Sequence, residues 1–172
     1  MKKILAILMA AVLLLGSASA LAEVVKFAED SSDFDIQMEL PEGASVGKQE
    51  DSELVSVCQI NSEGLASVYI TIAPSDIYGD LSMNDLSEDD VENLKSLAGE
   101  QYDNPTMSIE ITPSGNKYIH VSSDAGVASI FTLYRGYFVE LTQWHEDYSE
   151  LTDADYAFML QLLYNIDFLP LQ

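Results

Sequence analysis

The sequence predicts an α+β fold in which an antiparallel sheet is flanked by two helices, in the order β-β-β-α-β-β-β-β-α. Seven short segments alternate apolar and polar side chains or are short apolar runs, both of which are typical of strands. Short turns separate most of these segments, so consecutive strands are expected to be antiparallel neighbours. Two further segments repeat apolar residues at helical spacing, and their apolar faces must cover the sheet.

Three strands are predicted before the first helix. Residues 34–40 alternate apolar with acidic or amide side chains and end at the turn Pro41-Glu42-Gly43. A second strand follows at residues 53–60, and residues 66–73 form the third after a turn at residues 61–64. One face of the third strand would carry Val68, Ile70 and Ile72.

The first helix is expected to begin after Ser87, an N-cap residue that is followed by three acidic residues. Acidic side chains are favoured in the first turn because they oppose the helix dipole. Asn104-Pro105 should end the helix, since a residue before proline is disfavoured in helical conformation. The apolar stripe comprises Val91, Leu94, Ala98 and Tyr102, widened by Leu97.

Four strands and a second helix complete the predicted order. Gly136 supplies the positive φ that a tight hairpin between the last two strands needs. The helix should begin after Thr152, another N-cap residue, with acidic residues in its first turn. The strands are residues 107–112, 117–123, 127–134 and 137–144, and the apolar face of the helix is Phe158, Met159, Leu162, Leu163 and Ile166.

The N-terminus has the pattern of a cleavable secretory signal peptide. Two lysines precede an apolar run at residues 4–15, which is too short to span a bilayer as a helix. Ala20-Leu21-Ala22 fits the small-x-small cleavage rule, so cleavage is expected between Ala22 and Glu23, with Ala18-Ser19-Ala20 as the alternative. No later segment is long and apolar enough to be a transmembrane helix.

Cleavage would divide the chain into a signal peptide, residues 1–22, and a single domain, residues 23–172, that is secreted or periplasmic. The full chain has 7 Lys plus Arg against 29 Asp plus Glu, hence a net charge of −22. The signal removes two lysines and no acid, so the mature charge is −24. Such a charge repels nucleic acid and anionic surfaces and attracts cations.

The sequence contains no pattern that indicates an enzyme or a cofactor. Cys58 is the single cysteine and lies in an apolar run, which is typical of a buried thiol, so no intrachain disulfide is available. Gly-x-Ser-x-Gly, a phosphate-binding loop and a dinucleotide fingerprint are all absent. We therefore expect a non-enzymatic protein without a cofactor.

Two sets of residues were considered as cation ligands. His120 and His145 do not have metal-ligand spacing, and they would need the fold to bring them together with Glu140 or Asp124. Two acid-rich segments, residues 76–92 and 146–155, offer hard oxygen ligands for calcium, although no EF-hand pattern is present and the helix dipole explains several of the acids. The candidate cation ligands are Asp76, Asp80, Asp147 and Glu150.

Aromatic residues gather around the last predicted hairpin, from Tyr134 to Tyr148. Most of them are expected in the core, because aromatic residues are favoured in strands and interiors. The exception is a group at the end of the last strand, which is predicted to be an exposed patch that binds a protein or a cell-envelope component. This patch comprises Trp144, His145 and Tyr148.

Several features together resemble the PsbP-like domains, over about residues 33–170. They are the strand ending in Leu40-Pro41-Glu42-Gly43, the Gly115-Asn116 turn, the aromatic hairpin at Tyr134 to Phe138, and the last helix followed by Phe168-Leu169-Pro170. The resemblance implies a non-enzymatic binding or assembly module. It assigns no functional residue, because the basic N-terminal segment on which the extrinsic photosystem protein depends is missing after Ala22. We expect a binding or accessory domain, or alternatively a divalent-cation-binding protein.

Overall fold

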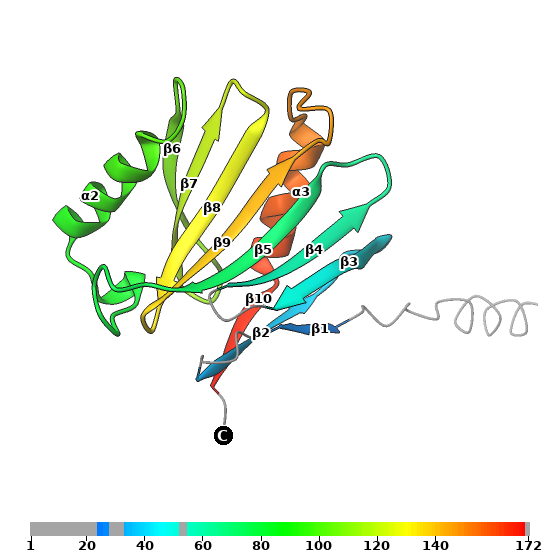
Figure 1. Ribbon diagram of the computed structural model, residues 1–172. Coiled ribbons are helices and arrows are strands. Elements are labelled where there is room, and N and C mark those ends of the chain that lie inside the picture. Colours follow the sequence, from blue (N-terminus) through cyan, green and yellow to red (C-terminus); the bar gives the residue numbers. More distant parts are fainter. Residues whose placement is uncertain (1–23, 28–32, 52–54, 171–172) are drawn as a thin grey trace, which may run out of the picture.

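The computed structural model describes residues 24–27, 33–51 and 55–170, and it confirms the α+β class (Figure 1). Two helices accompany two antiparallel sheets, one of seven strands and one of three. The predicted cleavage site between Ala22 and Glu23 lies outside the described residues. No helix in the described part is long and apolar enough to cross a membrane.

The large sheet has the strand order β3-β4-β5-β9-β8-β7-β6, with every neighbouring pair antiparallel. Its two halves are two meanders that join where β5 pairs with β9 along its whole length. In the predicted hairpin between β8 and β9, Arg135 and Gly136 have φ values of 50° and 79°, as a type I′ turn requires. The strands are β3 (Ala44–Asp51), β4 (Ser56–Ser62), β5 (Ser67–Pro74), β6 (Thr106–Ile111), β7 (Lys117–Ser123), β8 (Val127–Tyr134) and β9 (Tyr137–Trp144).

The small sheet places β2 (Phe34–Glu39) between β1 (Val24–Phe27) and β10 (Ile166–Pro170). The prediction of one sheet was wrong, because β2 pairs with the two ends of the described chain and not with its neighbour β3. Strands β1, β3 and β10 were not predicted. Ile166, assigned to the last helix from the sequence, begins β10.

Helix α3 (Asp153–Tyr164) packs on one side of the large sheet and leads into the small sheet (Figure 1), and the helix and the two sheets form the main core. Its N-cap is Thr152, as predicted, and four apolar side chains of its predicted face are buried. Alternate residues of β4, β5, β8 and β9 and the inner side chains of β2 meet this helix. The apolar side chains that β4, β5, β8 and β9 point toward α3 are therefore buried.

Helix α2 (Glu88–Gly99) packs against the opposite side of the sheet, at the β6–β7 end. The side chain of its predicted cap, Ser87, accepts a hydrogen bond from the Asp90 N–H at 3.2 Å. The helix is shorter than predicted and ends at Gly99, where an added Cβ would lie 2.7 Å from the Met107 sulfur. The 3₁₀ turn η1 (Met83–Asp85) precedes it and contributes Met83 to this second, smaller core.

Candidate functional site

The side of the large sheet opposite α3 is left without a covering helix over β4 and β5 (Figure 1). On β5, Val68, Ile70 and Ile72 point into the main core, so the intervening residues point to this uncovered side. The register carries the same alternation to both neighbouring strands. We call this surface the open face, made of Val57, Gln59, Asn61, Ser67, Tyr69, Thr71, Thr142 and Trp144, all of which are half-buried.

Two aromatic rings form the centre of the open face. Tyr69 of β5 and Trp144 of β9 are stacked, with ring centroids 4.1 Å apart and an angle of 9° between the ring planes. In the register, Tyr69 lies opposite Thr142 and Trp144 lies opposite Ser67, so the two rings meet diagonally across the strand pair. The stacking fixes both rings on the surface of the sheet.

A hydrogen-bonded group of amides and a hydroxyl lies beside the rings. Gln59 Nε2 donates to Asn61 Oδ1 at 3.0 Å and to Ser67 Oγ at 3.3 Å, and Ser67 Oγ donates to Asn61 Oδ1 at 2.8 Å. Gly47 of β3 approaches this group so closely that an added Cβ would lie 2.3 Å from Asn61 Nδ2. The glycine at the β3 bulge thus leaves room for the amides.

None of the eight residues of the open face ionises near neutral pH, in a chain that has 29 acidic residues. Acids border the face on two sides, because Glu140 of β9 lies opposite Thr71 and Glu50 of β3 lies opposite Val57. Only Trp144 of this surface is predicted from the sequence as a binding residue. Part of the rest could have been predicted, because Ser67, Tyr69 and Thr71 alternate with the apolar residues of β5 and so must share its other face.

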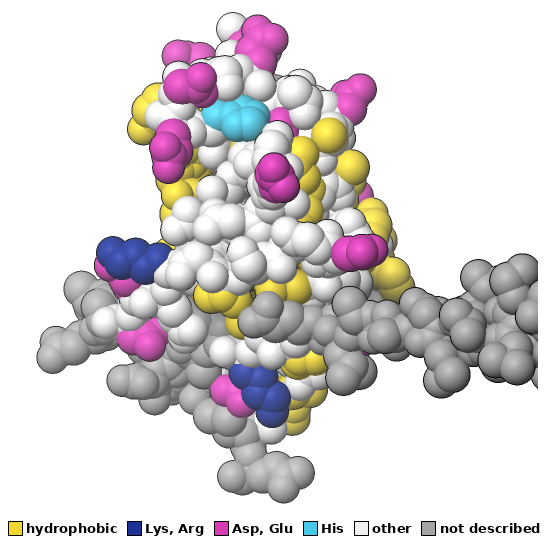
Figure 2. Space-filling view, turned by 90° about the vertical axis from the view of Figure 1, so that its right-hand side faces the viewer, with side chains coloured by type: hydrophobic (Ala, Val, Ile, Leu, Met, Phe, Trp, Pro, Cys, Tyr) yellow, Lys and Arg dark blue, Asp and Glu magenta, His cyan; other side chains and the backbone are white. Residues whose placement is uncertain are grey.

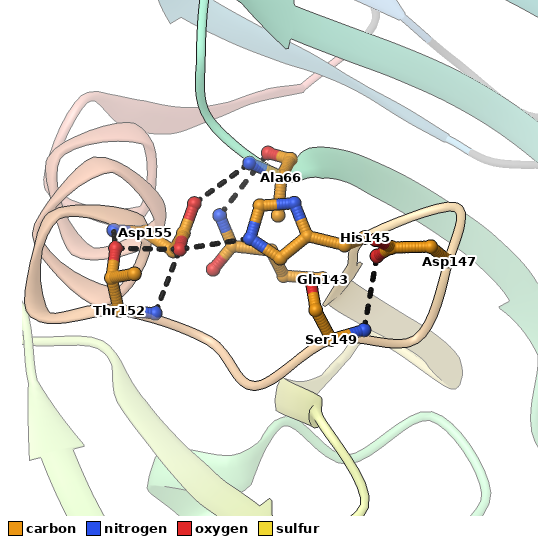
Figure 3. Close-up of polar contacts among 7 residues, drawn as sticks. All are labelled: Ala66, Gln143, His145, Asp147, Ser149, Thr152 and Asp155. Carbon is orange, nitrogen blue, oxygen red and sulfur yellow. Dashed lines mark hydrogen bonds and ion pairs between the residues drawn. The ribbon is translucent and has the colours of Figure 1, made fainter.

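His145 belongs to a different cluster, on the α3 side of β9 (Figure 3). Its Nε2 lies 3.1 Å from Asp155 Oδ2. Asp155 is 1% exposed and also accepts bonds from Ala66 N, Thr152 N and Thr152 Oγ1, each at 2.7 Å. Gln143 Nε2 donates to Ala66 O at 3.3 Å and completes the connection. The cluster ties the N-terminus of α3 to β9 and to the β4–β5 hairpin.

The environment of Asp155 favours its charged form. Burial raises the pKa of this carboxyl, but the hydrogen bonds from Ala66, Thr152 and His145 together outweigh burial and hold the pKa below its ordinary value. A carboxylate that accepts four bonds from protein groups is a structural anchor. His145 is engaged by it, so the imidazole is not presented to solvent as a free base.

The three residues predicted as one patch therefore point in different directions. Trp144 lies on the open face, His145 faces Asp155, and Tyr148 is 69% exposed in the turn after β9 with a φ of 55°. Adjacent residues at the end of a strand point to opposite sides of the sheet, and this alternation separates Trp144 from His145.

The four candidate cation ligands do not form a coordination site. Asp76, Asp80, Asp147 and Glu150 are all exposed, and the described residues include no group of three His, Cys, Asp or Glu side chains that could hold a metal ion. Figure 2 shows acidic side chains at the end of the molecule that carries a histidine, separated from one another by other residues. Hydrogen bonds from the Ser149 side chain and N–H lower the pKa of Asp147.

The environments of Cys58 and His120 do not activate these side chains for catalysis. Cys58 is completely buried, as predicted, and burial, with the charge of Asp51, raises the pKa of its thiol to about 11. His120 faces α3 near Tyr156, whereas Glu140 projects from the other side of the sheet, so the fold does not combine them. Burial lowers the pKa of His120, against the opposing effect of Glu110.

The fold and the open face define an α+β protein with an uncovered, aromatic and amide-lined sheet surface. No protein-family model matches the chain, and no curated protein matches it either.

Proposed function

We propose that this chain is an exported, non-enzymatic binding domain of the PsbP-like type, and that its open face binds a neutral glycan of the cell envelope. The observation that carries the proposal is the stacked pair Tyr69 and Trp144 beside the amide group of Gln59 and Asn61. The signal pattern of residues 1–22 supports delivery to the envelope.

The chemistry of this surface matches that of a sugar. One side of a pyranose ring presents C–H groups, which pack on the flat faces of aromatic side chains. Its hydroxyls both donate and accept hydrogen bonds, as side-chain amides do. Among the described residues, Gln59 Oε1 and Asn61 Nδ2 make no hydrogen bond, so each amide keeps one group for a ligand.

The negative charge of the protein favours a neutral glycan over an anionic one. The mature chain, at −24, repels anionic polymers, and the open face offers no Lys or Arg to neutralise them. A neutral polysaccharide has no such penalty. The buried, high-pKa thiol of Cys58 and the engaged imidazole of His145 support a binding role over a catalytic one.

Binding can be measured with the protein's own fluorescence, because Trp144 is the only tryptophan of the chain. The protein lacking residues 1–22 would be titrated with soluble neutral oligosaccharides of glucose, mannose and N-acetylglucosamine, and incubated with cellulose and chitin. We expect a saturable change in Trp144 fluorescence with at least one of these glycans, and depletion of the protein on the matching solid.

The variants Tyr69→Ala and Gln59→Ala should weaken this binding about tenfold, the loss expected for a stacked ring or a satisfied hydrogen bond. Tyr148→Ala removes an exposed aromatic outside the open face and serves as the control. If no neutral glycan changes the fluorescence, or if Tyr148→Ala weakens binding as much as Tyr69→Ala, the proposed function is wrong.

A further inference from the structure

A cavity of about 220 Å³ lies between α2 and the large sheet, beyond the open face. Helix α2 contributes Leu94, Leu97 and Ala98 to its wall, and the sheet contributes Phe131 and Phe138. Those two aromatic rings are stacked, with centroids 4.7 Å apart. The cavity exists because α2 packs on β6 and β7 and does not extend over β9.

The mouth of the cavity is largely apolar, with Gln101 as its exposed polar residue. Ile77 is 60% exposed and Leu97 is 55% exposed, and both line the cavity. Large apolar side chains exposed together at the rim of a pocket are typical of a binding site rather than of an ordinary solvated surface. The occupant expected from the walls and the mouth has an apolar body.

One charged group lies among these apolar residues. Glu140 of β9 lines the cavity, and its Oε1 accepts a hydrogen bond of 2.5 Å from Ser129 Oγ, a hydroxyl that is almost completely buried. No salt bridge of the described residues includes Glu140. Tyr102, which also lines the cavity, lies near both: burial raises the pKa of its phenol, and so does the charge of Glu140, while Ser129 opposes them.

We infer that this cavity is a binding site for an organic ammonium ion with an apolar body, such as an alkylamine. The apolar walls take the hydrocarbon part, and the Glu140 carboxylate accepts the N–H groups of the cation. A carboxylate beside apolar walls stabilises a cation more strongly than it would in water, because the local dielectric is low.

Other ligand classes fit this cavity less well. A fatty acid or another anion would place a second negative charge beside Glu140, in a chain whose net charge is already −22. An inorganic cation such as calcium needs six or more oxygen ligands, and no group of three candidate ligating side chains occurs among the described residues. The same net charge raises the local concentration of any cationic ligand.

This site shares no residue with the glycan surface, although β9 contributes to both: Phe138 and Glu140 line the cavity, whereas Thr142 and Trp144 belong to the open face. It is tested by calorimetric titration of the protein lacking residues 1–22 with hexylammonium, 1-hexanol and hexanoate, three probes that share a chain and differ in charge. We expect hexylammonium to bind at least about tenfold more tightly than 1-hexanol, the gain typical of a hydrogen bond to a charged group, and hexanoate not to bind.

The matched variants are Glu140→Gln and Glu110→Gln. Both glutamates lie on strands and accept a bond from a serine hydroxyl, but only Glu140 lines the cavity. Glu140→Gln should abolish the preference for hexylammonium over hexanol, while Glu110→Gln should keep it. Equal binding of the two probes by the unsubstituted protein would overturn the inference without any variant, as would equal losses in both variants or NMR shift changes away from Ser129 and Phe138.

Discussion

The two sides of the seven-stranded sheet differ in how completely helices bury them. On one side, α3 buries Phe158, Met159, Leu162 and Leu163, and its first turn is tied down through Asp155. On the other side, α2 buries Val91 and Leu94 but leaves Leu97 exposed over a cavity, and β4 and β5 have no covering helix.

This contrast separates the residues that stabilise the fold from those that are free to bind. On the α3 side, the apolar side chains of the helix and of both sheets form one buried core. The α2 side keeps a stacked aromatic pair, an amide group and a cavity accessible. Substitutions on the two sides should therefore differ in their effect on stability, and the predictions below compare matched pairs.

The largest difference is expected between Leu162→Ala on α3 and Leu97→Ala on α2. Leu162 is fully buried, so its truncation leaves a cavity in the main core and should lower the free energy of unfolding by about 2–5 kcal/mol. Leu97 is mostly exposed, and its truncation should change stability by no more than about 0.5 kcal/mol. Urea unfolding followed by far-UV circular dichroism measures both. Similar losses would show that α2 and α3 contribute equally to the fold.

A smaller loss, of about 2 kcal/mol at neutral pH, is expected for Asp155→Asn. The amide would replace an oxygen that accepts bonds from Thr152 N and Oγ1, and would leave these donors unsatisfied near the core. Asp153→Asn, in the same helical turn but exposed, is the control and should cost less than about 1 kcal/mol.

The Asp155→Asn loss should also depend on pH. The pKa of Asp155 is lower in the folded state than in the unfolded state, so its stabilisation is complete above the unfolded value of about 3.9 and disappears as pH falls through the folded value. The stabilities of the unsubstituted protein and of Asp155→Asn should therefore converge in acid. A difference that stays constant from pH 7 to acid would contradict the role of the charge.

The smallest effect is expected at the helix caps. Ser87→Ala should cost about 1 kcal/mol, because the Ser87 side chain satisfies one N–H of α2. Thr152→Ala should cost more than Ser87→Ala. Each cap hydroxyl also donates to an acid three residues later, Ser87 to Asp90 and Thr152 to Asp155, but only Asp155 is buried. Thermal unfolding of the two variants in parallel makes the comparison. An equal cost for the two caps would mean that the burial of Asp155 does not strengthen its bond to Thr152.

Local patterns were sufficient to predict the helices, their caps and most strands of the large sheet. Ser87 and Thr152 cap as predicted because capping depends on residues within a single turn. Strand β3 was missed because its side chains from Lys48 to Asp51 are polar and exposed, so an edge strand of this kind has no hydrophobic period. Strand β10 was missed because Ile166 continues the spacing of Leu162 and Leu163, and no Gly or Pro marks the end of α3.

The binding surfaces were less predictable than the fold. The stack of Tyr69 on Trp144 depends on the pairing of β5 with β9, two strands far apart in the sequence. The cavity depends on the position at which α2 packs on the sheet, and the amphipathic pattern of the helix does not specify that position. His145 and Asp155 lie ten residues apart, but their contact requires α3 to return to the end of β9. Each of these features follows from tertiary packing rather than from local sequence.

The central position of β2 also determines when the molecule finishes folding. Because β2 pairs with both the first and the last described strands, the small sheet closes only after β10 is available. Until then the ring of Phe34 lacks its contact with the ring of Phe168, which forms when the sheet closes. Pairings between the two ends of a chain are made late and slowly. A chain that emerges from its N-terminus thus holds β2 without one of its two partners until β10 has followed, so the small sheet closes after all strands of the large sheet have been made.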